Sequence, residues 1–263
     1  MIYCLLFVMN LNKKLYLEEI KDKQMKTLKF TLLWMCLIVF TAIDASAHAL
    51  WIETASAGSK GTAHDVKIYY GEFAAGERDV PEKWYSDVKD FSLWLVAPDG
   101  QKTKLETVAG AAFYSSSFTP EKDGVYTLMV SHEAAELGGT TKYHFISSAH
   151  VAVGKTTQVD AGQNANVLKV YPENQEVFKK NKSVKLYAQL NGQPLANKSV
   201  SIASSSGWTK EFKTDSKGMI EFSPLWSGRY VAEAQHYTET NGQHNGKDFH
   251  AAWIGSTFSF EVK

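Results

Sequence analysis

The chain has 263 residues but only two cysteines, Cys4 and Cys36. Both precede the segment that we expect to fold. A folded part without thiols excludes disulfide scaffolds, iron–sulfur clusters and thiolate zinc sites. Any metal site in it has to use histidine, carboxylate, methionine or backbone donors.

The common catalytic motifs are also missing. The sequence has no G-x-S-x-G elbow, no H-E-x-x-H pair and no glycine-rich phosphate loop. The stretch "GERDVPEKW" has the character of a charged surface loop. Lysine plus arginine number 28 against 28 acidic residues, so no basic excess indicates nucleic acid or an anionic membrane as a partner. We therefore expect a protein that is not an enzyme and does not bind nucleic acid.

One long apolar run is present, at residues 30–42, and it is too short to span a bilayer comfortably. Two lysines precede it, and Ala45 and Ala47 supply the small residues that signal peptidase requires. The pattern predicts a leader over residues 1–47, whose signal peptide starts at Met25 and is removed after Ala47. The product would be periplasmic or secreted, with no membrane insertion after cleavage.

The remaining sequence consists of short runs rich in β-branched and aromatic residues, such as "VKIYYGEF", "GVYTLMVSH" and "SVKLYAQL". Turn residues separate these runs, and helical periodicity is weak. A polar stretch at residues 156–166 indicates a linker. We predict an all-β chain of two tandem immunoglobulin-like β-sandwich domains after the signal peptide. The first would cover residues 48–155 and the second, with seven short strands, residues 167–263.

All eight histidines lie beyond the expected cleavage point. If cleavage follows Ala47, His48 becomes the first residue and offers two adjacent nitrogen donors, its free amine and its ring. Such a pair can chelate a transition metal, whereas an internal histidine offers the ring alone. The alternative is that cleavage falls there by chance and "ALWIET" is simply a first strand.

Three further histidines are candidate metal ligands. His236 and His250 flank a 13-residue segment, "YTETNGQHNGKDF", which we expect to be a loop between the last two strands. Counting by twos places both on apolar faces at the loop end, where opposed Cβ atoms lie about 4.5–5.5 Å apart. That spacing would let two imidazoles share a metal. His64 begins a strand in phase with Val66 and Ile68. Each of the three is otherwise a rim or structural histidine bonded to backbone or water.

Several segments resemble a known family. "AHALWIET", "VKIYYGEF", "GVYTLMVSH", "YHFISSAHVAVG" and "STFSFEV" are similar to an exported family of unknown function, often described as the periplasmic component of a cobalt or nickel uptake system. The resemblance implies a β-sandwich protein that binds Ni, Co or Cu and passes the metal to a membrane transporter component. By motif only His48 carries over. Leu50 departs from the Met-x-His and His-x-His starts of neighbouring metal carriers.

A second resemblance covers residues 191–236. "NGQPLANKSVSIA" and "TDSKGMIEFSPLWSGRYVAEAQH" are similar to the carboxypeptidase-regulatory or transthyretin-like module, which implies an immunoglobulin-like fold without catalysis. Two functions stay open at this stage. One is an exported transition-metal-binding protein, and the other is a structural, adhesive or carbohydrate-binding pair of β-sandwiches in which His48 is incidental.

Overall fold

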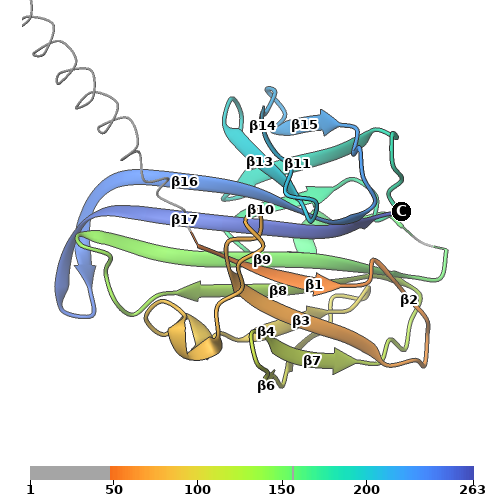
Figure 1. The fold of residues 1–263 in the computed structure, drawn as a ribbon, viewed down its shortest axis with the longest axis horizontal. Helices are drawn as coiled ribbons and strands as arrows, with labels where there is room; N and C mark the ends of the chain where they lie inside the picture. The colour runs from red at the N-terminus through yellow and green to blue at the C-terminus, as the bar shows by residue number, and fades with distance from the viewer. Residues whose placement is uncertain (1–47, 156) are drawn as a thin grey trace, which may run out of the picture. The chain divides into compact units, whose positions relative to one another are not determined.

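The regular elements of the computed structural model are almost all β-strands (Figure 1). The structure describes residues 48–155 and 157–263. The predicted leader lies outside the described residues, so its signal peptide and cleavage site stay predictions. The predicted all-β class is confirmed, and the only helical elements in the described part are three single-turn 3₁₀ helices.

The first half contains nine strands and two of the 3₁₀ helices. Their bounds are β1 Ala49–Thr54, β2 Ala57–Gly58, β3 His64–Gly71, η1 Pro81–Lys83, η2 Val88–Asp90, β4 Leu93–Val96, β5 Lys102–Leu105, β6 Val108–Ala109, β7 Tyr114–Phe118, β8 Gly124–Glu133 and β9 Thr141–Val153.

The second half contains eight strands and one 3₁₀ helix. Their bounds are η3 Ala161–Gln163, β10 Leu168–Pro172, β11 Val184–Leu190, β12 Gln193–Pro194, β13 Ser199–Ser204, β14 Thr209–Lys213, β15 Met219–Phe222, β16 Gly228–His244 and β17 Lys247–Val262.

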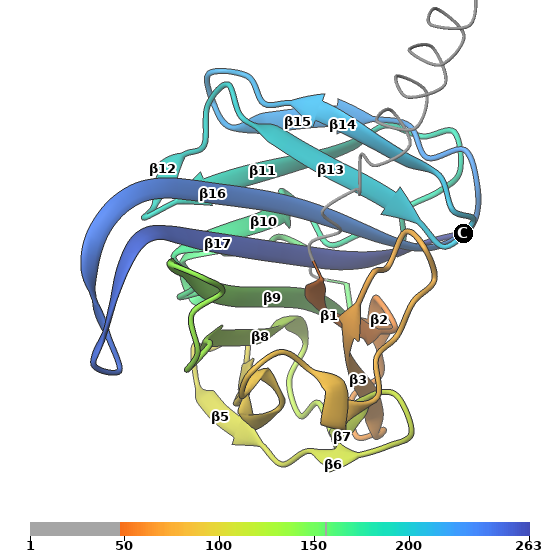
Figure 2. The same ribbon diagram turned by 60° about the vertical axis from the view of Figure 1, so that its left-hand side comes forward.

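One sheet is shared by both halves. Its strands follow the order β14-β13-β16-β17-β9-β8-β4-β5, and β17 pairs in parallel with β9 from Ala251↔Thr141 to Ser259↔Ala149. Figure 2 shows these two strands side by side in the middle of the molecule. A sheet of order β1-β3-β7-β6 completes the first sandwich, and β10, β11, β12 and β15 complete the second.

Each sandwich has its own core, and each core includes one side chain from a strand of the other half. The first core is built around Leu50, Ile68 and Leu128 and includes Trp253 from β17. The second core is built around Phe258 and Phe260, and it includes Ile146 from β9. This happens because successive side chains along β9 and β17 point to opposite faces of the shared sheet, and one face lies in each core.

The expected linker is not a loose connection. Asp160 caps η3 by accepting a hydrogen bond from Gly162 N at 2.8 Å. Asn166 is buried, and its Nδ2 donates to Val130 O on β8 and Ser147 O on β9. The segment therefore packs on the shared sheet, and the described residues form one compact unit. The domain limits at residues 155 and 167 stay a prediction.

Both sandwiches carry the same tyrosine corner. Tyr126 Oη donates to Lys122 O at 3.1 Å, and Tyr230 Oη donates to Trp226 O at 3.0 Å, each four residues back in the chain. In each case a glycine two residues before the tyrosine has a positive φ, 134° at Gly124 and 128° at Gly228. A tyrosine corner is a hallmark of immunoglobulin-like sandwiches.

The predicted loop over residues 237–249 is wrong. β16 and β17 continue through it as a hairpin that closes on Asn245 and Gly246, with φ values of 50° and 78°. Asn-Gly is the preferred pair for such a two-residue turn, because both positions need a positive φ. Both strands extend past the two cores and curl over (Figure 1). None of the described helices is long and apolar enough to cross a membrane.

Candidate functional site

His48 lies directly before β1, and its side chain is 38% exposed. Its Nε2 is 3.3 Å from Oδ2 of Asp79, and its ring lies 5.4 Å from the ring of Tyr70. Because an ionised carboxylate only accepts, the contact favours the tautomer with its proton on Nε2. Nδ1, the ring nitrogen closer to the backbone, then keeps its lone pair.

The backbone of the β3–η1 connection brings Asp79 to His48. Asp79 N donates to Tyr70 O at 2.9 Å, and Glu77 N donates to Glu72 O at 2.9 Å, so the chain folds back on the end of β3. Gly71 permits this return. A Cβ on it would lie only 2.7 Å from Glu77 O, and its φ is 143°.

Arg78 anchors the same connection from the opposite face of β1. Its guanidinium lies 5.0 Å from the ring centre of Tyr69 and 5.6 Å from that of Trp51. Its Nη2 is 3.1 Å from Glu53 Oε1. Neighbouring residues thus turn to opposite sides, Arg78 to the aromatic pair and Asp79 to His48. The charged stretch that contains them is mostly exposed, as expected of a surface loop, but its Pro81 and Trp84 are buried.

Tyr70 connects His48 to the aromatic part of the first core. Its ring contacts Trp84 and Phe145, each at 5.5 Å between centroids. Phe145 in turn lies 5.5 Å from Trp253. Burial raises the pKa of the Tyr70 phenol above its ordinary range, so this group stays protonated. One side of His48 is therefore held against a rigid, apolar wall.

His64 lies at the far end of the β1–β3 pair. Ala49 is opposite Gly71, whereas His64 starts β3 beyond the Thr54↔Val66 pair, so roughly 25 Å of strand separates it from His48. His64 is 7% exposed, and its Nε2 lies 2.8 Å from Thr54 Oγ1 and 3.2 Å from Ala55 O. Desolvation by burial lowers its pKa. These contacts match the structural alternative for this residue.

The expected opposition of His236 and His250 is also wrong. His236 pairs with Ile254, and a register shift between Glu239 and Gly242 lies opposite His250. The two histidines are thus about 13 Å apart along the hairpin. His236 Nε2 lies 2.8 Å from Thr238 Oγ1, and His250 Nδ1 lies 2.7 Å from Asn241 Oδ1. The two are not opposed because the hairpin turns at Asn245–Gly246 and not at the middle of the assumed loop, which displaces the register by four residues.

The four candidate histidines therefore do not converge on one point. Within residues 48–155 and 157–263, no group of three or more His, Cys, Asp or Glu side chains is arranged to hold a metal ion. Any metal at His48 has to draw on backbone nitrogen as well as side chains. Metal binding by His64, His236 and His250 stays a prediction.

A small cavity of about 90 Å³ lies on the other side of β1, with Ala49, Trp51, Phe73 and Glu233 among the residues that line it. Burial, with a smaller contribution from the nearby carboxylate of Glu72, raises the pKa of Glu233 to about 7. Gln235 Nε2 donates to Glu233 Oε1 at 2.8 Å. Sequence reasoning missed this acid, because nothing in the β16 pattern marks Glu233 as buried.

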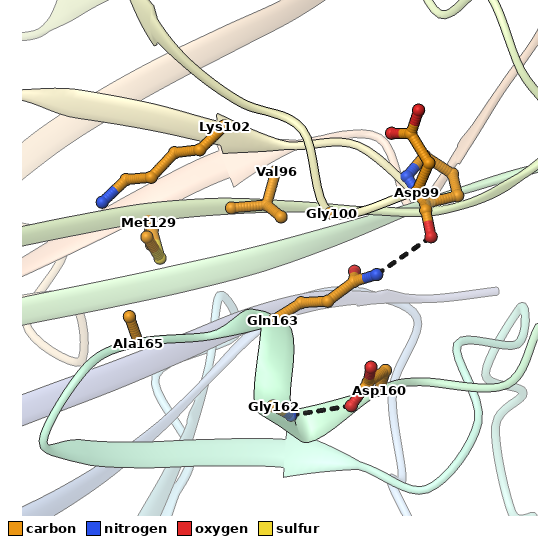
Figure 3. A pocket seen from close by; sticks show the side chains of 10 residues that line it. Val96, Asp99, Gly100, Lys102, Met129, Asp160, Gly162, Gln163 and Ala165 are labelled. Carbon is orange, nitrogen blue, oxygen red and sulfur yellow. Dashed lines mark hydrogen bonds between the residues drawn. The ribbon is translucent and has the colours of Figure 1, made fainter.

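A second cavity, of about 480 Å³, lies between the β4–β5 turn and η3 (Figure 3). The polar groups around it are engaged with each other. Gln163 Nε2 donates across it to Pro98 O at 3.0 Å, and Asp99 pairs with Lys122 at its rim. None of the four candidate histidines lines this cavity.

Asp79 and Tyr70 are the contacts of His48 that sequence reasoning did not find. The available signal was the glycine that ends "KIYYG", followed within eight residues by an adjacent arginine and aspartate. A glycine at a strand end marks a close backbone approach. Only the folded chain shows that the approaching segment carries the carboxylate.

Comparisons with known proteins find remote likenesses in structure. A Salmonella alpha-2-macroglobulin reacted with methylamine is 10% identical, with a TM-score of 0.29, over 81% of this chain and 15% of that one. A DUF4785 family protein of Legionella pneumophila is 13% identical, with a TM-score of 0.28, over 69% of this chain and 50% of that one. A segment of two fibronectin type-III domains from chicken tenascin is 12% identical, with a TM-score of 0.21, over 78% of this chain and 95% of that one.

The chain thus spans half or less of the first two of these structures. No curated protein matches it. One family model does match, over residues 45–238, which include β1 to β15 and most of β16 but not β17. On that match, the chain belongs to the family described as "Domain of unknown function (DUF4198)".

Proposed function

We propose that this chain is an exported, non-enzymatic protein that binds a transition metal, Ni, Co or Cu, at His48. The metal is cargo, held by the free amine and the Nδ1 of a first-residue histidine. The sequence supports export through the leader pattern, and the family resemblance supports the choice of metals. The proposal includes a periplasmic location and a membrane transporter component that receives the metal.

The contact between His48 Nε2 and Asp79 Oδ2 at 3.3 Å carries the proposal. A metal-bound histidine commonly donates its second ring nitrogen to a carboxylate, which fixes the ring and makes it a better donor. Here the carboxylate of Asp79 contacts Nε2 of His48. Nδ1 is then free to bind the metal together with the backbone amine of the same residue. Had Asp79 faced Nδ1, that chelate would be blocked.

The surroundings of His48 also suit a site that loads and releases a metal. The ring is partly exposed on one side and lies against Tyr70 on the other. A partly exposed site leaves room for water or for a donor from a partner. Copper would bind most tightly in vitro whatever the physiological metal, because affinity follows the Irving–Williams order.

The test is calorimetric titration of Cu(II) and Ni(II) into protein that begins at His48, beside protein with one glycine added before it. We expect stoichiometric binding in the first and its loss in the second, because the added peptide bond removes the free amine. A His132→Ala variant that begins at His48 is the matched control and should bind normally, because His132 is not one of the candidate ligands. Equal binding with and without the added glycine would refute the proposal.

A further inference from the structure

One end of the second sandwich carries exposed apolar side chains. Leu225 and Trp226, in the β15–β16 loop, are 51% and 40% exposed. The Trp226 ring lies 6.0 Å from that of Trp208, in the neighbouring β13–β14 loop. We call Leu225, Trp226 and Trp208 the Leu-Trp patch. It lies away from His48, whose strand belongs to the first sandwich.

The Leu-Trp patch is held rigidly. Tyr230 Oη binds both backbone groups of Trp226, accepting from its N at 3.2 Å and donating to its O at 3.0 Å. Ser205 N donates to Arg229 O at 2.9 Å, which ties the β13–β14 loop to the start of β16. These bonds hold the loops in one conformation, so Leu225 and Trp226 stay exposed in the folded protein. A partner that binds them would therefore have little loop entropy to overcome.

Three exposed lysines stand beside the Leu-Trp patch. Lys179, Lys180 and Lys182 belong to the β10–β11 connection. This connection is tied to the patch where Asn181 N donates to Pro224 O at 2.8 Å, next to Leu225. Residues 176–183 contain these three lysines and one acidic residue, Glu176, so the local charge is positive although the whole chain is balanced.

We propose that this end of the second sandwich docks on the surface of an anionic lipid bilayer. Leu225 and Trp226 would enter the headgroup region, and the three lysines would face lipid phosphates. Tryptophan favours that region, since its ring is apolar while its N–H stays hydrated. Lysines next to an apolar tip add attraction to an anionic surface.

The test is co-sedimentation of residues 48–263, which form one compact unit. The vesicles are phosphatidylcholine alone and an equal mixture of phosphatidylcholine and phosphatidylglycerol. We expect binding to the mixed vesicles and little to phosphatidylcholine. The double variant Leu225→Ser, Trp226→Ser should lose about tenfold or more in affinity, because it removes the apolar contact. Tyr237→Ser is the matched control, since Tyr237 is 58% exposed but lies in the hairpin.

The charge contribution is tested separately. The triple variant of Lys179, Lys180 and Lys182 to Gln, and salt at about 0.5 M, should each weaken binding severalfold, since salt screens exposed charges. The unfolding midpoint of every variant is measured to show that it folds. Absence of binding to mixed vesicles by the unchanged protein overturns the proposal. Equal binding by the unchanged protein and the Leu225–Trp226 variant overturns it as well.

Discussion

Asp79 Oδ2 lies 3.3 Å from Nε2 of His48, although 31 residues separate them in the chain. The contact exists because Gly71 lets the chain return over the end of β3. It assigns different tasks to the two ring nitrogens, one facing the protein and the other available to a metal.

Asp79→Asn should weaken metal binding at His48. An amide can face Nε2 with its donor group, which disfavours the tautomer that leaves Nδ1 free. Loss of such a partner typically reduces metal affinity about 10–100-fold. Calorimetric titration of Cu(II) into protein that begins at His48 measures the effect. Asp99→Asn, in the β4–β5 turn, is the control, and equal affinities in the two variants would contradict the role given to Asp79.

His150 should make the protein less stable in mild acid. It is 3% exposed, and burial lowers its pKa from 6.5 to about 3. Below pH 6.5 His150 binds a proton in the unfolded chain but stays neutral in the folded chain. The free energy of unfolding therefore falls as the pH drops toward 3. At pH 5 the loss is about 2 kcal/mol.

Urea unfolding of His150→Leu between about pH 7 and pH 5 checks this. The variant should lose less stability over that range than the unchanged protein, by roughly 2 kcal/mol. His250→Leu, at an exposed histidine, should follow the unchanged protein. If the free energy of unfolding changed equally with pH in all three proteins, His150 would not be kept neutral by the fold.

Tyr230→Phe should destabilise the second sandwich. The phenol binds the N and O of Trp226, and its removal leaves both without that partner. We expect a loss of about 1–3 kcal/mol in the free energy of unfolding. Tyr126→Phe should cost a similar amount, since that phenol binds Lys122 in the same way. Tyr237→Phe, at an exposed site, is the control, and no difference among the three would count against the tyrosine corners.

Glu233→Gln should stabilise the protein above neutral pH. The folded pKa of about 7 exceeds the ordinary 4.5, because burial disfavours the charged form. The folded chain therefore holds a proton that the unfolded chain releases, and stability falls as the pH rises from 4.5 through 7. At about pH 8 the variant should be more stable by roughly 3 kcal/mol.

Thermal unfolding across this pH range measures the effect. Glu239→Gln, an exposed position on the same strand, should leave the pH dependence unchanged. A variant at Glu233 that unfolds with the same pH profile as the unchanged protein would mean that this carboxyl ionises normally when folded.

Local patterns predicted the strands well. The runs "VKIYYGEF", "GVYTLMVSH" and "SVKLYAQL" all form strands, because alternation and turn residues act over a few positions. The hairpin of β16 and β17 was missed for a local reason too. Its Asn245–Gly246 turn is a strong hairpin signal, but the earlier Asn241–Gly242 pair and the polar residues around it resemble a loop.

The candidate site was only partly accessible to such reasoning. His48 was found through its place after the expected cleavage point. His236 and His250 were paired by assuming that both strands end at these residues, but the strands continue to a turn at Asn245–Gly246, which sets His236 opposite Ile254. The burial of Glu233 depends on Trp51 of β1 packing beside Val231 of β16, which no local signal reports.

Residue order alone was enough to predict the all-β class, most of the strands and His48 as a candidate metal ligand. These follow from side-chain alternation, turn chemistry and residue identity, which are local properties. Tertiary structure alone decided that β17 pairs with β9 and that Asp79 meets His48. Both join segments far apart in the chain, and such contacts depend on how the two cores exclude water together, not on any short stretch of residues.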